Sequence, residues 1–372
     1  MTDCTPLQLE FPGFNRRKIQ ASFSGGHVSS DAGGYILLRQ VDRRLGLFKQ
    51  VSCLLSDPRR IKSCEHDLTS LLRQRVYPLA LGYEDLNDHE TLRHDLALQT
   101  GVERETELVS ASTLCRLENR ADREAAWTLH QVMVDQFIKS FKRPPGRLVL
   151  DFDVTDDAVH GKQEGRFFHG FYNHYCFLPL YVFCGEQRLV SYLRPSKIDG
   201  AKHAWAILSL LVKRLRRAWP KVRIVFRGDS GFCRHRMFDW CEKNDVDYIV
   251  TNIEGDPQQL YDKLYCKRGD MENRIKEQQL DLFADRTSCH HWWANQFRLL
   301  LASLAYTLLE SIRRLALRGT ELAKAQCGTI RLKLLKVGAV IIKNTRRIRF
   351  LLSSAYPHQQ LFKHVAEQLD SS

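Results

Sequence analysis

The sequence predicts a multidomain α/β protein with three parts: an N-terminal α-helical domain, a mixed-sheet core, and a C-terminal helix followed by a basic β-hairpin. Residues 21–143 show helical apolar periodicity, the stretch after 147 holds short strand-type apolar runs, and 330–352 alternate apolar and basic side chains. A chain of 372 residues is also too long for one typical core, so two or three domains are expected.

The N-terminal part divides into an arm and a helical block. Residues 1–20 contain Pro6, Pro12 and Gly13, which interrupt regular structure, so an extended and poorly fixed arm is expected. Residues 21–143 form the predicted helical domain, which contacts DNA or, alternatively, serves packing or dimerisation. Its arginines are candidates for exposed phosphate contacts: Arg73, Arg75, Arg93, Arg116 and Arg120.

The core follows a breaker-rich linker and is expected over residues 147–312. Its elements come in the order strand, strand, strand, helix, strand, helix, strand, helix. Short links between the first three strands imply antiparallel pairs, and helical crossovers imply parallel neighbours. This is the order of an RNase H-like mixed sheet, in which the first and fourth strands lie side by side. The last predicted domain, 320–372, comprises the basic hairpin and a tail.

Two acidic residues close strand-type runs in the core. Asp153 ends the apolar run that starts at Arg147, and Asp229 ends the run that starts at Lys221. A third acid, Glu272, lies on a later helix. In phosphodiester exchange, two Mg²⁺ ions about 3.5–4 Å apart stabilise both the attacking and the leaving oxygen. A few carboxylates are enough to hold the two ions. The sequence thus predicts three catalytic metal ligands for Mg²⁺, with Mn²⁺ as a substitute; the alternative is acids that only cap strands.

Four nearby acids compete with this assignment: Asp151, Asp156, Asp157 and Glu277. Asp151 and Asp153 share one side of an extended strand, so alternation alone does not separate them. Asp153 is preferred because the apolar run ends there and Thr155 adds a hydroxyl. Glu277 lies about a turn and a half beyond Glu272.

The predicted helix around the third acid carries two further candidates. Tyr265, Arg268 and Glu272 are spaced three and four residues apart, which places them on one helical face. Arg268 is then able to neutralise a DNA phosphate, and Tyr265 to donate a hydrogen bond to it.

Positive charge is concentrated towards the C-terminus. The net charge is +13, and twelve Lys and Arg stand against two acids between Arg298 and Arg349. This excess favours binding to a polyanion, most simply double-stranded DNA, over the alternative of a basic face that only contacts solvent. The alternating stretch supplies the expected DNA contacts Arg331, Lys333, Arg346, Arg347 and Arg349.

Cysteine usage and hydropathy indicate the compartment. Eleven cysteines occur without a CxxC pair, which is typical of reduced thiols, and neither Cys64-Glu65-His66 nor Cys289-His290-His291 has a second pair at zinc spacing. The longest apolar run, 299–309, is too short to span a bilayer, and the start lacks a signal-peptide pattern. A cytoplasmic, nucleoid-associated protein without membrane contact is expected.

The chain resembles bacterial insertion-sequence transposases of the DDE class, specifically the insertion-sequence thirteen-eighty group. The resemblance is carried by the stretches SGGHVSSDAGGYILLRQVD, LDFDVTDDAVHGKQEG, FRGDSGF and MENRIKEQQLDLFADRTSCHHWW. It implies an RNase H-like catalytic domain, a triad of Asp153, Asp229 and Glu272, and Mg²⁺-dependent cleavage and strand transfer at terminal inverted repeats. Because two DNA ends are paired, a homodimer on DNA is expected.

Two departures from that family pattern stand out. Its Tyr-Arg-Glu-Lys signature falls on Tyr265, Arg268 and Glu272, but its last position is Gln279, so that phosphate contact is lost or passes to Lys276. Only 43 positions separate Asp229 from Glu272, so an insertion usual in relatives is shortened near 250–256. The alternatives are a shortened remnant that binds inverted-repeat DNA but cuts poorly, an RNase H-like nuclease without strand transfer, and a structural protein.

Overall fold

The structure is a computed structural model that describes residues 8–23, 30–60, 64–248, 258 and 268–370. The chain divides into two compact units, each built from separated segments. Unit 1 holds residues 1–120, 281–283 and 304–372, and unit 2 holds residues 121–280 and 284–303. Within the described ranges, no helix combines the length and apolar character needed to cross a membrane.

The helical block of unit 1 runs from Tyr35 to Asn119. Asp67 and Asp95 start two of its helices by accepting hydrogen bonds from backbone N–H groups of the first turn, as N-cap residues do. Gly46, in the left-handed region with φ 61°, ends the first helix. The helices are α1 (Tyr35–Leu45), α2 (Leu47–Leu54), α3 (Leu68–Leu81), α4 (His89–Leu92), α5 (Leu96–Val102) and α6 (Ala111–Asn119).

Two arginines of this block are not available to DNA. Arg73 is buried and pairs with Asp42 at 2.8 Å and with Glu103 at 2.7 Å. Arg75 pairs with Glu118 at 2.6 Å, with both side chains 1% exposed. The expectation of exposed side chains at these two positions was wrong. The reason is that α3 is buried almost all round, so its charged side chains must be paired inside.

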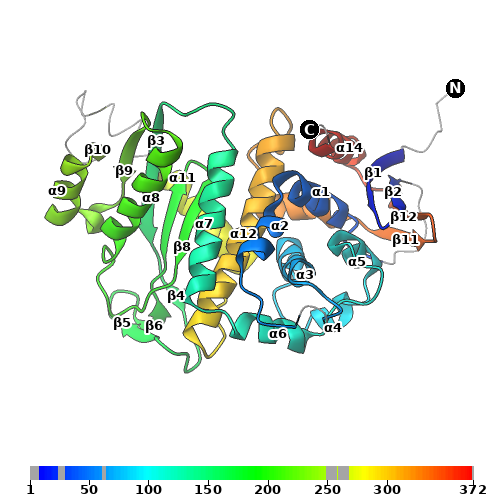
Figure 1. Ribbon diagram of the computed structural model, residues 1–372, viewed down its shortest axis with the longest axis horizontal. Helices are drawn as coiled ribbons and strands as arrows, with labels where there is room; N and C mark the ends of the chain where they lie inside the picture. The colour runs from blue at the N-terminus through cyan, green and yellow to red at the C-terminus, as the bar shows by residue number, and fades with distance from the viewer. Residues whose placement is uncertain (1–7, 24–29, 61–63, 249–257, 259–267, 371–372) are drawn as a thin grey trace. The chain divides into compact units, whose positions relative to one another are not determined.

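In unit 1, two strands from the N-terminal part of the sequence and two from the C-terminal part form one four-stranded sheet, in the order β1-β2-β12-β11. Residues 8–20 are therefore not a loose arm, because alternate side chains such as Leu9, Phe11 and Ile19 are buried in the core of the unit. β2 and β12 are parallel and place Lys18 opposite Arg347 (Figure 1). The strands are β1 (Gln8–Phe14), β2 (Arg17–Ser22), β11 (Ala339–Lys343) and β12 (Arg347–Leu352).

The predicted basic hairpin is confirmed only in its second half. β11 and β12 pair antiparallel, but residues 327–335 are helical, as α13 (Cys327–Ile330) and a π-helical turn, η4 (Arg331–Leu335). The strand expected from Ile330 to Leu334 was wrong. Leu332 is 70% exposed while Leu334 and Leu335 are both buried, which is helical rather than alternating burial. α14 (Gln359–Asp370) follows the hairpin.

Unit 2 is built on a five-stranded mixed sheet with the order β10-β9-β3-β7-β8. β3 is parallel to β9 and antiparallel to β7, and β7 is antiparallel to β8. This arrangement confirms the predicted RNase H-like sheet with its first and fourth strands adjacent. The strands are β3 (Arg147–Val154), β7 (Leu180–Cys184), β8 (Gln187–Tyr192), β9 (Arg223–Arg227) and β10 (Val246–Tyr248).

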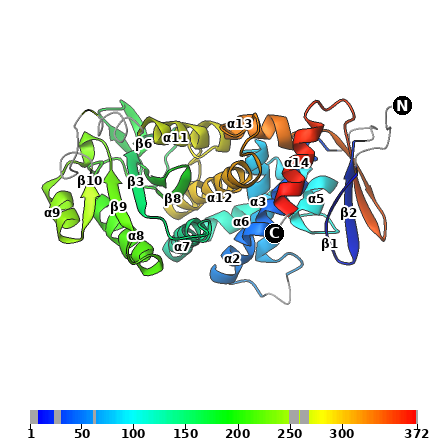
Figure 2. The same ribbon diagram turned by 90° about the horizontal axis from the view of Figure 1, so that it is seen from above.

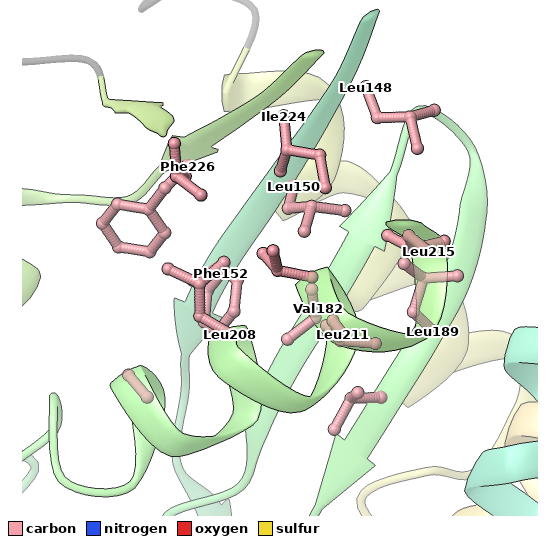
Figure 3. Packing of buried hydrophobic residues seen from close by; sticks show 14 of the residues in the cluster. Leu148, Leu150, Phe152, Val182, Leu189, Leu208, Leu211, Leu215, Ile224 and Phe226 are labelled. Carbon is pink, nitrogen blue, oxygen red and sulfur yellow. The ribbon is translucent and has the colours of Figure 1, made fainter. Parts of the chain in front are cut away.

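The core of unit 2 lies between this sheet and α8 (Ala204–Ala218). Figure 3 shows leucines of α8 over Leu150 and Phe152 of β3 and Phe226 of β9. Because side chains alternate along a strand, Asp151 and Asp153 project to the opposite face. Figure 2 shows α7 (Arg123–Lys139) and α8 along one side of the sheet and α11 (Arg268–Leu282) along the other.

The boundaries of the two units differ from the predicted domain boundaries at three places. α7 was expected in the helical domain but belongs to unit 2, because its Val134 and Phe137 are part of the core under the sheet. The C-terminal hairpin, expected as a separate part, shares a sheet with the N-terminal strands. α12 (Trp292–Ala316) is divided between the units, with residues up to Ser303 in unit 2.

Unit 2 also contains a three-stranded sheet that was not predicted, with the order β4-β6-β5. The apolar stretch of residues 175–184 is divided between two sheets, because β6 ends at Phe177 and β7 starts at Leu180. Pro179 between them has no N–H to continue a ladder. The small strands are β4 (Asp157–Ala158), β5 (Phe167–His169) and β6 (His174–Phe177).

Candidate active site

The two strand-end acids come to neighbouring positions. β3 and β9 are parallel with Asp151 opposite Arg227, an offset of 76 residues. The pairing ends there with β9; the same offset continued by two residues would set Asp153 beside Asp229, which follows the carboxyl end of β9. The side chain of Asp153 is on the face away from α8 by strand alternation. The juxtaposition of the two acids follows from the parallel pairing of strands about 75 residues apart in sequence.

Three aromatic rings fix the backbone under these acids. Phe152 packs edge-on against Phe226 with ring centroids 5.1 Å apart, and Phe232 contacts both at 6.2 and 6.3 Å. Phe232 belongs to the short helix η2 (Ser230–Phe232), which Asp229 starts by accepting a 2.9 Å hydrogen bond from the Gly231 N–H. A Cβ on Gly228 would lie 2.9 Å from the Phe232 ring, so glycine permits this close approach.

Asp151 is held in a buried ion pair rather than at the strand end. Its Oδ2 accepts a 2.6 Å hydrogen bond from Arg227 Nη2, and its Oδ1 accepts a second from Arg227 Nε. The side chains are 3% and 8% exposed. A bidentate pair of this kind neutralises the carboxylate inside the protein. Asp153, the other acid that alternation left unresolved, is also buried, at 7% exposure, and lies nearer the carboxyl end of β3.

The other competing acids of this segment are also engaged. Asp156 lies 2.8 Å from Nε2 of His174. Asp157 is buried, and its Oδ2 accepts a 2.9 Å hydrogen bond from the Thr287 hydroxyl. Burial raises the pKa of Asp157 well above its ordinary value, and the hydrogen bond from Thr287 opposes this only in part. This shift favours the protonated form of Asp157, which acts as a structural group.

We predict that Asp157→Asn stabilises unit 2 at neutral pH. The raised pKa means that the folded protein keeps a proton that the unfolded chain loses above its ordinary pKa of 3.8. Stability of the parent protein therefore falls as pH rises through that window, whereas the neutral amide has no such loss. Urea unfolding from about pH 4 to about pH 7 should show the variant's advantage growing with pH. An advantage that stays constant across this range would contradict the assignment.

The negative charges at this end of the sheet act on the phenol of Tyr172. Its pKa is raised to about 12, first by burial and then by the negative charges of Asp156, Asp153 and Asp229, with Cys176 contributing. The ring also lies 6.1 Å from that of His174. Tyr172 and His174 were not singled out from the sequence, although the aromatic and histidine-rich run HGFYNHY is a visible signal.

α11 distinguishes the two candidate glutamates. Glu277 is buried and pairs with Arg274 at 2.9 Å, and Arg274 also bonds Glu186 at 2.5 Å. Glu272 is half-buried and lies one and a half turns earlier. Gln279 donates a 3.2 Å hydrogen bond to the backbone oxygen of Asp156, which ties the helix to the segment after β3. Gln279, which stands where the family signature has a lysine, thus makes a hydrogen bond within the fold.

The remaining predicted residues fall in several places. Tyr265 lies outside the described residues, as does the side chain of Arg268, the first residue of α11; Lys276 is exposed on α11. Within the described ranges, no three His, Cys, Asp or Glu side chains are grouped closely enough to hold one ion. Asp153 and Asp229 thus belong to or follow adjacent parallel strands, but the described residues form no three-carboxylate cluster with Glu272.

The basic residues of unit 1 separate into two sets. Arg346, Arg347 and Arg349 are exposed on and beside β12. Arg331 instead donates hydrogen bonds to the backbone oxygens of Ala80 and Asp281, and burial lowers its pKa. Its guanidinium group supports the fold of unit 1. Lys333 is half-buried in η4.

Comparison with known proteins adds the family. The family model described as "Transposase DDE domain group 1" matches residues 11–250 and 245–372, which is nearly the whole chain. The chain belongs to this family of DDE transposases. The transposase thus carries the predicted class of fold and activity, while the narrower insertion-sequence group stays a prediction.

Solved structures and curated proteins add little to this assignment. The Mos1 transposase paired-end complex with left transposon end shares 12% identity over 61% of this chain and 76% of its own, with a TM-score of 0.26. A pre-cleavage Mos1 transpososome shares 10% over 60% and 78%, with a TM-score of 0.22. Similarity at this level carries no argument about the transposase. No curated protein matches the chain.

Proposed function

We propose that the transposase cleaves DNA at the terminal inverted repeats of its element and joins the cut end to target DNA. The observation that carries this proposal is the placement of Asp153 and Asp229 at the ends of adjacent parallel strands. The competing acids Asp151, Asp156 and Asp157 are engaged by Arg227, His174 and Thr287. Glu272 is the proposed third acid because Glu277 is buried against Arg274.

The donor set fits Mg²⁺, with Mn²⁺ as a substitute. Carboxylate oxygens are the ligands Mg²⁺ prefers, and it commonly takes one or two of them together with water and substrate phosphate. Asp153 and Asp229 would therefore hold the ion, and Glu272 would complete the set when DNA is present. A bound divalent ion supplies charge stabilisation for the phosphodiester oxygens. The aromatic support under β3 and β9 holds the two carboxylates in place.

DNA binding is proposed for the exposed basic face of the β2–β12 sheet. Lys18 lies opposite Arg347 on the parallel neighbour strand, and Arg349 follows two residues along on the same face. Tyr265, Arg268, Lys276 and Lys333 are retained as proposed contacts to the DNA. Arg331 has less support, because its guanidinium group bonds two backbone oxygens.

The triple variant Arg346→Ala, Arg347→Ala, Arg349→Ala tests this face. Each lost phosphate contact should lower the slope of log K against log salt by about 0.9, so the slope should fall by about 2.7 if all three contact phosphate. Fluorescence anisotropy with a terminal-repeat duplex between about 50 and 200 mM salt measures it. An Arg143→Ala variant is an exposed control in unit 2. An unchanged slope would remove the hairpin from the DNA interface.

Gly231→Ala tests the positioning of Asp229. A Cβ at residue 231 would lie 2.9 Å from Oδ1 of Asp229, so the carboxylate or the turn must shift. Misplacement of a reacting group by about 1 Å costs on the order of a hundredfold in rate, so a loss between about tenfold and a hundredfold is expected in cleavage. Thermal unfolding should change little. Full activity with an unchanged fold would show that Asp229 does not need this geometry.

The decisive experiment uses purified protein, a labelled duplex carrying the terminal repeat of the parent element, and Mg²⁺ or Mn²⁺. Cleavage at the repeat end, followed by joining to a target plasmid, would support the proposal. Cleavage without joining would indicate a nuclease of this fold. Sedimentation of the complex with one and two repeat ends would test the proposed homodimer.

A second candidate function is repeat binding without efficient cleavage. It is favoured by the short distance of 43 positions between Asp229 and Glu272. The family model also matches in two segments that meet at 245–250, within the same stretch. Specific binding with no product in either metal would support this candidate.

A further inference from the structure

One hairpin of unit 2 carries a group of exposed aromatic side chains. β5 and β6 pair antiparallel with Phe168 opposite Tyr175, and the N–H of Asn173 closes the turn on the oxygen of His169 at 2.8 Å (Figure 1). Phe171 at the tip is 85% exposed, Phe168 is 53% exposed and Tyr175 is 47% exposed. Exposed apolar groups gathered on one element mark interaction sites more often than scattered ones do.

The rings of this hairpin contact one another, and an arginine side chain lies over one of them. Phe168 contacts Tyr175 edge-on with centroids 5.7 Å apart, and Phe171 contacts Tyr172 in the same way at 5.0 Å. The Arg166 guanidinium lies 4.4 Å from the centre of the Tyr175 ring. Aromatic rings next to basic groups are the combination with which proteins bind unpaired nucleic acid, because rings stack on bases and cations attract phosphates.

The hairpin stands beside the proposed catalytic acids. His174 of β6 lies 2.8 Å from Asp156, which follows β3. Tyr172, next to Phe171, is close enough to Asp153 and Asp229 for their charges to act on its phenol. DNA bound at those acids would therefore pass the tip of the hairpin.

We propose that the β5–β6 hairpin is a stacking platform for unpaired bases next to the phosphodiester that is cut. Phe171 is the leading stacking residue, with Phe168 and Tyr175 behind it. In an intact duplex each base is covered by its neighbours, so a ring at this position gains contact only with bases that have left the stack. This inference rests on the proposed function, since it requires DNA at Asp153 and Asp229.

The test measures binding without cleavage, in EDTA. The probes are the terminal-repeat duplex and the same duplex with a few unpaired nucleotides at the cut position, one of them a fluorescent base analogue. The expected result is tighter binding of the unpaired probe and quenching of the analogue. Phe171→Ala should lose about five- to tenfold of that preference, the lower part of the range for one stacked base. Phe171→Trp should restore it.

A matched control and the possible outcomes keep the inference separate from the proposed function. Trp127→Ala removes an aromatic ring that is 50% exposed on α7, across the sheet from the acids, and should leave the preference unchanged. Equal binding of both probes by the parent protein, or an unchanged preference in Phe171→Ala, overturns the inference even if cleavage occurs. A clear preference lost only in Phe171→Ala supports it even if the shortened core does not cut. Absence of all DNA binding overturns both.

Discussion

Replacing Asp153 by Asn is expected to abolish DNA cleavage by the transposase while DNA binding persists. The amide keeps the size of the side chain but removes the charge that would hold a divalent ion at the end of β3. Loss of metal-based charge stabilisation costs several kcal/mol, so a fall of at least about a thousandfold in cleavage rate is expected. Gel-based cleavage of the terminal-repeat duplex and anisotropy binding in parallel give the two readouts.

A variant of the second acid and a matched control variant test which carboxylates cleavage requires. Asp229→Asn should lose cleavage as Asp153→Asn does, because the two acids stand at or just after the carboxyl ends of adjacent parallel strands and are proposed to hold the same ion. Asp135→Asn, on α7 and paired with Arg214 at 2.5 Å, is a charge-matched control that should retain activity. Full cleavage by Asp153→Asn would refute the assignment of the first acid.

The two glutamates of α11 give an independent comparison. Glu272→Gln should lose cleavage with little change in thermal stability, since Glu272 is only half-buried. Glu277→Gln should instead lower stability, because it weakens a pair with Arg274 whose glutamate side chain is 0% exposed. If the two variants exchange these phenotypes, Glu277 is the third acid.

Arg227→Met is expected to produce the largest loss of stability in unit 2. The substitution removes the guanidinium group that neutralises Asp151, whose side chain is 3% exposed. Breaking a buried pair by removing one partner costs about 3–5 kcal/mol. For a domain of this size the melting temperature should fall by about 6–20 °C, as measured by circular dichroism or calorimetry.

The double variant Asp151→Leu, Arg227→Met shows whether the loss of stability arises from the buried charge that Arg227 no longer neutralises. Replacing both partners by apolar side chains is often neutral or stabilising, so the double variant should recover most of the lost stability. A double variant as unstable as Arg227→Met would mean that packing, not charge, sets the loss. Cleavage by the refolded double variant would also show directly that Asp151 is not a metal ligand.

Several features followed from sequence patterns because local rules control them. The apolar strand runs that end at Asp153 and Asp229 and the helical crossovers between strands were enough to predict the sheet order. The helices of residues 35–119 followed from apolar periodicity, together with cap residues such as Asp67 and Asp95. The DDE family also follows from the sequence, because the family model matches nearly the whole chain.

Contacts between residues far apart in the sequence decided the features that local sequence patterns leave open. Asp151 and Asp153 have the same alternation, and only the parallel neighbour β9, which brings Arg227 opposite Asp151, separates them. The period-two pattern from Ile330 to Leu334 predicted a strand, but burial of Leu334 and Leu335 together favours a helix there. The pairing of β2 with β12 joins residues more than 300 positions apart. Such contacts depend on which surfaces meet in the folded chain, and a residue's own neighbours in sequence do not encode them.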